Sequence, residues 1–149
     1  MSDENGSFHD WIMHLTRADA PTRKLAAQVL GDWVYPHGGL PADEVRLIHQ
    51  ALLHAAVIET DHDVVAAQLT SLVWSNRPLV GLEGWDHLLE RTPLLPSYAQ
   101  EQALALLSVS GEAAFADRLE ALATQHPAFD HALTRKTIDT IRRTCRPED

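Results

Sequence analysis

The chain has 149 residues, of which 12 are Lys or Arg and 21 are Asp or Glu, so its net charge is −9. Hydrophobic residues make up 45%, enough for a core, and a mean hydropathy of −0.18 excludes disordered and fibrous classes. No apolar run reaches the roughly 18 residues of a membrane span. An acidic N-terminus unlike a secretory leader and one cysteine, Cys145, predict a cytoplasmic protein without a disulfide.

Apolar residues follow a helical spacing almost throughout, and no window alternates as a half-buried strand does. Helix starts are indicated by capping residues at Ser7, Asp19 and Asp61, and by the capping-box pattern of residues 97–100. The expected helices cover residues 8–18, 19–33, 41–58, 64–74, 82–91, 97–111, 112–124 and 127–143. The sequence therefore predicts an all-α domain over 8–144, between a disordered N-terminus, 1–7, and a tail, 145–149.

Short segments recur along the chain at shifts of 40, 74 and 112 residues, close to multiples of 37 to 40. A helix-pair unit of that length is typical of α-solenoids, in which each pair buries its apolar face on the next. The recurring segments are Ala26-Ala27-Gln28 with Ala66-Ala67-Gln68, Trp11…Leu15 with Trp85…Leu89, and Thr22-Arg23-Lys24 with Thr134-Arg135-Lys136.

Residues 19–31, Asp-Ala-Pro-Thr-Arg-Lys-Leu-Ala-Ala-Gln-Val-Leu-Gly, resemble the second helix of a bacterial HEAT-like (armadillo-type) repeat. That family typically has Asp-Pro at the turn, an apolar–Arg pair, an Ala-Ala step and Leu-Gly. Residues 61–67 and 99–104 are similar but looser, and some units lack the turn Asp or the repeat Arg. The resemblance covers most of 8–143. It implies a right-handed α-α superhelix of four antiparallel helix pairs, and an interaction scaffold rather than an enzyme.

The spacing also predicts which helix faces are buried. On helix 19–33, the apolar face contains Leu25 and Leu30, whereas Ala27 and Gly31 fall on the opposite side. The four tryptophans are expected in the core, with Trp85, beside two glycines, as the candidate if one is exposed. The residues predicted to be core are Val29, Leu30, Leu69, Leu72, Leu104 and Leu107.

In the resembling family, the second helices line the concave face, so the resemblance implies that a partner binds along their exposed sides. Trp85 is added because exposed tryptophans are typical of interface hot spots. The candidate partner-binding residues are Arg23, Lys24, Gln28, Asp63, Ala67, Ser71, Trp85, Glu101, Arg135 and Asp139.

The motifs do not indicate catalysis, a metal or a cofactor. The local histidine pairs, such as His49 and His54, are five residues apart, whereas two ligands on one helix need a spacing of three or four. His37-Gly38-Gly39 is not accompanied by a Gly-x-Ser-x-Gly elbow. Cys145 lies among arginines, which would lower a thiol pKa, but also near the C-terminus. We therefore expect no enzyme activity.

Charge narrows the choice of partner. Residues 1–134 carry 7 basic and 18 acidic side chains, whereas 135–149 carry 5 basic and 3 acidic. An acidic body repels nucleic acid, whose binding depends on neutralising phosphates, and suits a basic protein. The sequence favours a protein-interaction module, and a sharper version of this hypothesis is an immunity-type protein that neutralises a basic toxin. The alternatives are a nucleic-acid-acting protein resembling alkylpurine DNA glycosylases, and a regulatory subunit or chaperone.

Overall fold

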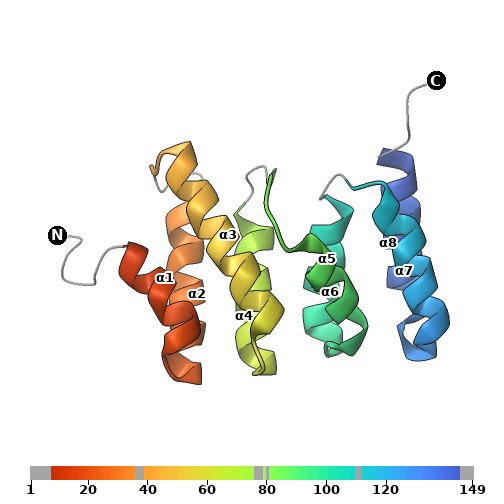
Figure 1. Ribbon diagram of the computed structural model, residues 1–149, viewed down its shortest axis with the longest axis horizontal. Helices are drawn as coiled ribbons and strands as arrows, with labels where there is room; N and C mark the ends of the chain where they lie inside the picture. Colours follow the sequence, from red (N-terminus) through yellow and green to blue (C-terminus); the bar gives the residue numbers. More distant parts are fainter. Residues whose placement is uncertain (1–7, 36–38, 76–78, 80, 110–111, 145–149) are drawn as a thin grey trace. The chain divides into compact units, whose positions relative to one another are not determined.

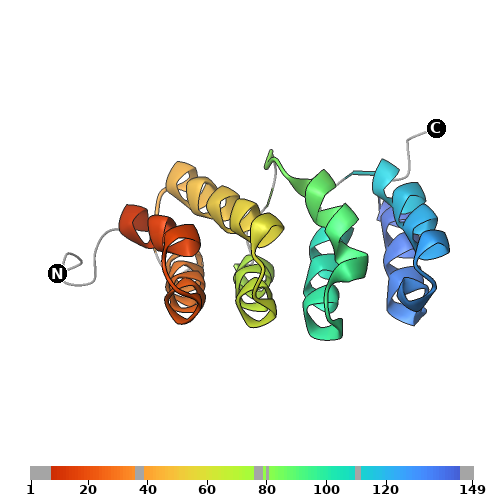
Figure 2. The same cartoon turned by 60° about the horizontal axis from the view of Figure 1, so that its bottom comes forward.

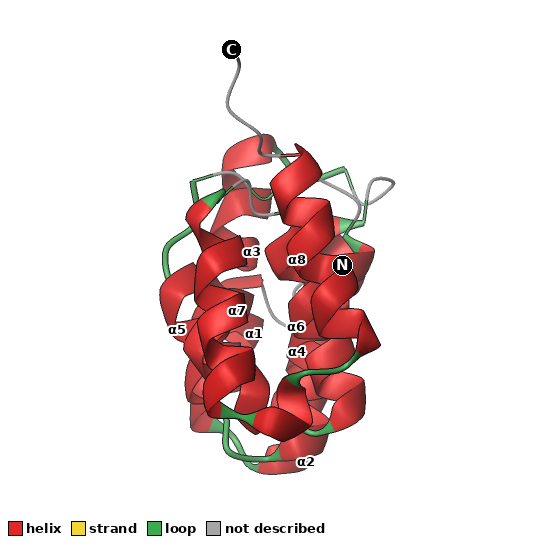
Figure 3. Ribbon diagram, turned by 90° about the vertical axis from the view of Figure 1, so that its right-hand side faces the viewer, coloured by secondary structure: helices red, strands yellow, loops and turns green. Residues whose placement is uncertain are grey.

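The computed structural model describes residues 8–35, 39–75, 79, 81–109 and 112–144. The chain divides into two compact units, Met1–Gly84 (unit 1) and Trp85–Asp149 (unit 2). All regular elements of the described residues are helical (Figure 3), which confirms the predicted all-α fold. In the part of the chain that is described, no helix is long and apolar enough to span a bilayer.

The described residues of unit 1 form four α-helices, labelled α1 to α4 in Figure 1. Two of them, α1 and α3, lie against each other, and α2 and α4 form a second layer that packs on the first (Figure 2). Two of the predicted caps are confirmed: the Asp19 carboxylate accepts a hydrogen bond from the Thr22 amide, and that of Asp61 accepts two. The third, Ser7, lies outside the described residues. The helices are α1 (Phe8–Arg17), α2 (Ala20–Val34), α3 (Ala42–Ile58) and α4 (His62–Trp74).

The buried side of α2 differs from the prediction. Ala27 is fully buried, whereas Leu25 is 48% exposed. The reason is the close approach of α4: Ser71 donates a hydrogen bond to the Ala27 carbonyl oxygen at 2.7 Å, and a Cβ at Gly31 would lie only 2.5 Å from Ser71 Oγ. The smallest side chains of α2, not its most apolar side, therefore face its neighbour.

The described residues of unit 2 form four α-helices and two 3-10 turns. Some of these helices begin later in the chain than the sequence predicts. The helix expected from residue 82 begins at Trp85, because Gly81 and Gly84 have positive φ angles of 79° and 110°. The final helix begins at Ala132, after a separate 3-10 turn. The elements are α5 (Trp85–Arg91), η3 (Thr92–Leu94), α6 (Ser97–Ser108), α7 (Ala114–Gln125), η4 (Pro127–Phe129) and α8 (Ala132–Thr144).

The capping box expected at residues 97–100 does not form. Pro96 occupies the N-cap position of α6 and provides no side-chain hydrogen bond. Gln100 instead donates to the backbone carbonyl oxygen of Thr92 at 3.1 Å, because the chain before α6 folds back as η3. The polar residue of the pattern thus holds a turn rather than a helix end.

Most of the predicted core is confirmed. Leu30, Leu69, Leu72, Leu104 and Leu107 are at most 1% exposed, whereas Val29 is only half-buried. Among the described side chains of unit 2 that are less than 2% exposed, the largest is Phe129, in the turn before α8. Burying a leucine fully contributes roughly 1.5–3 kcal/mol, so these residues dominate the stability of each unit.

Candidate functional site

Some of the residues predicted to contact a partner are exposed in unit 1. Lys24 and Gln28 are exposed on α2, Asp63 is exposed on α4, and Ala67 is half-buried one turn after it. Since α2 and α4 pack side by side, these residues border one seam between the two helices. The same side of α4 ends in Trp74, whose side chain is 65% exposed. Trp74 is seven residues after Ala67 and eleven residues after Asp63, so the three side chains lie on the same face of α4.

Two of the predicted contact residues are instead buried. Ser71 is 8% exposed and uses its hydroxyl in the hydrogen bond to Ala27 that joins α4 to α2. Trp85 is 6% exposed, at the first position of α5. The exposed tryptophan of the described residues is therefore Trp74, not Trp85. Helical spacing does not find it, because Trp74 closes a helix in which nearly every side carries apolar residues.

Arg23 points inward and forms a buried ion pair. Its Nε and Nη2 atoms donate to the two carboxylate oxygens of Glu59 at 2.9 and 2.7 Å, and Nη1 donates to the Ala18 carbonyl oxygen. The Glu59 side chain is 4% exposed and that of Arg23 19%. Arg23 is therefore a structural residue and not a partner contact. Its pairing joins the start of α2 to the turn between α3 and α4.

Glu59 is also held by two further donors. The Asp61 backbone amide donates to Oε2 at 3.0 Å, and Gln68 Nε2 donates to Oε1 at 3.3 Å. Burial alone would raise the pKa of Glu59, but the hydrogen bonds from Arg23 and Asp61 outweigh it and hold the pKa below its ordinary value. The carboxylate is thus ionised in the folded unit, and its charge is fully used inside it.

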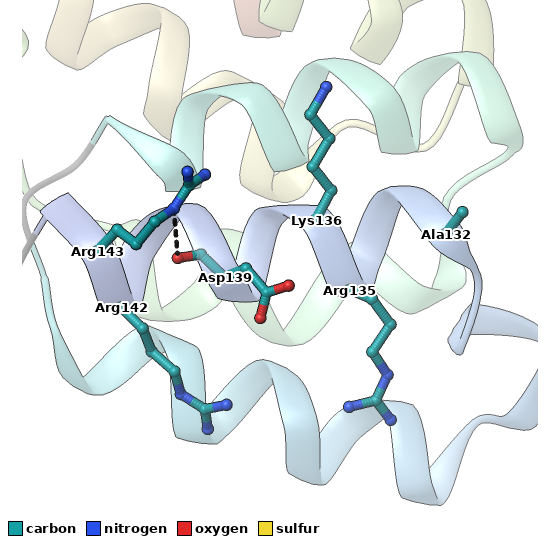
Figure 4. Close-up of a pocket in the computed structure, with 6 residues that line it drawn as sticks. All are labelled: Ala132, Arg135, Lys136, Asp139, Arg142 and Arg143. Carbon is teal, nitrogen blue, oxygen red and sulfur yellow. Dashed lines mark hydrogen bonds between the residues drawn. The ribbon is translucent and has the colours of Figure 1, made fainter.

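In unit 2 the remaining candidates lie on two helices. Glu101 is exposed on α6, and Arg135 and Asp139 are exposed on α8. The α8 residues border an open hollow of about 760 Å³ with four cationic side chains and one carboxylate. Figure 4 shows Arg135 and Arg142 pointing to one side of α8, and Lys136 and Arg143 to the other.

The two arginines on the α7 side are neutralised by the protein itself. Arg135 contacts Asp130 at 2.8 Å and Glu120 at 3.2 Å. Arg142 contacts Glu120 at 2.7 Å and Asp117 at 2.9 Å. Hydrogen bonds from Arg142 and Arg135 hold the pKa of Glu120 below its ordinary value. This half of the α8 surface is therefore an internal ion-pair network rather than a free cationic patch.

Within the described residues, no three His, Cys, Asp or Glu side chains converge as a metal site requires. His37, Gly38 and Cys145 lie outside the described residues, as do the segments 1–7 and 145–149.

Comparison with known proteins finds no match to a family, to a curated protein or to a solved structure. What the chain does must therefore be inferred from the surfaces of the two units.

Proposed function

We propose that the chain is a non-catalytic protein-interaction module built from HEAT-like helix pairs. Support for the architecture comes from the contacts within each unit. In unit 1, α1 contacts α2 and α3 contacts α4; in unit 2, α5 contacts α6 and α7 contacts α8. Second helices contact each other, α2 with α4 and α6 with α8, as stacked repeats do.

The observation that carries the proposal is the exposure of Trp74 beside the predicted face of α4. An indole left 65% in water contributes little to folding, so its retention on a helix surface favours binding. Asp63 and Ala67 lie on the same side of α4, and Lys24 and Gln28 on the adjoining side of α2. A large apolar anchor surrounded by small and polar residues is the usual composition of an interface.

The charge of unit 1 supports a basic partner. Met1–Gly84 contains 11 acidic and 5 basic side chains, a balance of −6, and Arg23 is already paired. Such a surface speeds encounter with a cationic protein. A toxin such as a basic nuclease, neutralised by an immunity-type protein, fits this chemistry.

Nucleic acid is a weaker candidate for a physical reason. The cationic surface on α8 is where a duplex would have to bind, and two of its four cations are already paired with Asp117, Glu120 and Asp130. Phosphates would have to displace these carboxylates to release counterions. We expect negligible duplex binding at physiological salt, and a mobility-shift titration showing micromolar affinity would favour the glycosylase-like alternative.

The proposal is tested with the partner itself. The chain is used to capture proteins from its native host, and the captured protein is purified and measured against two variants. Trp74→Ala should weaken binding by about 30-fold, the effect of a typical hot-spot residue. Ile58→Ala is the matched control, because Ile58 is also in unit 1 and also 65% exposed. Equal effects of the two variants would contradict the proposed face.

A second measurement tests the role of charge. Asp63→Lys should reduce the association rate severalfold while the dissociation rate changes less, and raising the salt concentration should reduce the same rate. An unchanged association rate would move the interface away from α4.

A further inference from the structure

Unit 2 has a second hollow, of about 460 Å³, between the turn that precedes α6 and the turn that precedes α8. Its walls are mixed. The apolar side chains are Pro93, Leu95 and Pro96 from the first turn and Ala128 and Leu133 from the second, and polar groups make up a similar share of the lining. None of the candidate residues predicted from the sequence lies here except Glu101, which lines the hollow from α6.

Two of the other polar side chains that line this hollow, Gln100 from α6 and His131 from the turn before α8, are hydrogen-bonded to each other. Gln100 Nε2 donates to the carbonyl oxygens of Thr92 and Leu95, which directs its Oε1 toward His131 Nε2 at 2.7 Å. The Thr134 amide donates to His131 Nδ1 at 3.4 Å. Gln100 and His131 are thus hydrogen-bonded to each other and to nearby backbone groups.

Glu101 is different. It is exposed, and within the described residues its carboxylate has no ion pair. A carboxylate close to apolar side chains can bind an arginine. The aliphatic stem of the arginine packs on the apolar side chains while its guanidinium binds the carboxylate. Leu94 and Tyr98, 68% and 46% exposed, extend the apolar surface beside the hollow. Tyr98 is one helical turn before Glu101 on α6.

We propose that this hollow is a subsite for an arginine side chain of the partner, with Glu101 binding the guanidinium and Leu95 and Leu133 contacting the stem. The inference rests on the proposed function, because it assigns a chemical feature to the basic partner. The choice of a cation follows from charge complementarity: among the described residues that line the hollow, Glu101 is the only Asp, Glu, Lys or Arg, on a chain whose net charge is −9.

The test does not require the partner. N-acetyl-arginine amide is titrated into the 15N-labelled chain, with N-acetyl-citrulline amide as the neutral probe of the same shape. We expect chemical-shift changes at residues 93–101 and 128–133 with the arginine probe and much smaller ones with citrulline. Glu101→Gln should weaken arginine binding about tenfold, because a charge-assisted hydrogen bond is lost. Glu112→Gln removes the same charge from an exposed position of unit 2 outside the hollow and should leave binding unchanged.

Three results would overturn the inference: equal shifts with both probes, shifts centred away from this hollow, or equal affinity of Glu101→Gln and the unaltered chain. These outcomes are separate from those of the proposed function. If arginine does not bind here but partner binding still depends on Trp74, the subsite is wrong and the proposed function stands. If arginine binds here but Trp74→Ala has no effect on the partner, the α4 face is wrong instead.

Discussion

The two units place their charges in opposite ways. Among its described residues, unit 1 has one largely buried ion pair, Arg23 with Glu59, which is bonded to three further groups: the Ala18 carbonyl oxygen, the Asp61 amide and the Gln68 side chain. Unit 2 keeps its ion pairs at the surface, where α7 forms them with α5 and with α8. A buried pair is costly to break on one side, whereas exposed pairs contribute little each and are screened by salt. The stability of unit 1 should therefore fall when one partner of the pair is removed or the pH is lowered. The contribution of the ion pairs to the stability of unit 2 should fall as the salt concentration rises.

The largest effect is expected from Glu59→Ala. Removing the carboxylate leaves the guanidinium of Arg23 mostly buried without its partner, a change that costs about 3 kcal/mol. Thermal or denaturant unfolding measures it. Asp32→Ala, on the exposed side of α2, is the control and should change stability little. The double variant Arg23→Met/Glu59→Met should recover part of the loss, since it leaves no unpaired charge. If the double variant is less stable than Glu59→Ala, the unpaired charge of Arg23 is not the cause of the loss.

Gly31→Ala tests the close approach in unit 1. Alanine normally stabilises a helix by about 1 kcal/mol over glycine, but here the new Cβ would meet Ser71 Oγ at 2.5 Å and Ser71 Cβ at 2.9 Å. Overpacking of this kind typically costs about 1–3 kcal/mol. Ser71→Gly removes both atoms but also the hydrogen bond to the Ala27 carbonyl oxygen, so Gly31→Ala should cost less stability in the Ser71→Gly background than in the unaltered chain. A stabilised single variant would mean that α2 and α4 lie farther apart than described.

Acid should destabilise unit 1 through Glu59. The folded pKa of Glu59 lies below its ordinary value of about 4.5, so the unfolded chain binds the proton more tightly. This stability is fully present above pH 4.5 and is lost as the pH falls through the folded pKa. Denaturant midpoints between pH 6 and pH 3 should fall less steeply in Glu59→Gln than in the unaltered chain. Equal slopes would assign the acid response to other carboxylates.

The smallest effect is expected from Glu120→Gln in unit 2. Glu120 bridges Arg135 and Arg142, yet all three side chains are about 45% exposed. The loss of stability should be small at low salt and should disappear near 1 M salt, where the screening length is about 3 Å. Glu101→Gln, which removes an exposed carboxylate without an ion pair to a described residue, is the control. A loss that persists at high salt would mean that this network behaves like the buried pair of unit 1.

The features that the sequence predicts correctly arise mainly from local interactions. The Asp19 and Asp61 caps join atoms two or three residues apart, and residue spacing alone reveals them. On α8, Arg135 and Asp139, which the HEAT-like resemblance implies are on the outer side of the helix, are exposed. Interactions between distant helices were not predicted. Arg23 was expected on the surface, but it pairs with Glu59, which is 36 residues away in the sequence. For the candidate face, Lys24, Gln28, Asp63 and Glu101 are indeed exposed, whereas Ser71 and Trp85 are not.

The all-α class and most helix ends could thus be derived from spacing and capping, because both arise from hydrogen bonds and side-chain directions within a few residues. Which side of α2 is buried, and which tryptophan is exposed, depended on packing. Helices approach most closely where their side chains are smallest, so Ala27 and Gly31 met Ser71 while the larger Leu25 was left in solvent. Hydrophobicity read along one helix contains no information about the shape of the next.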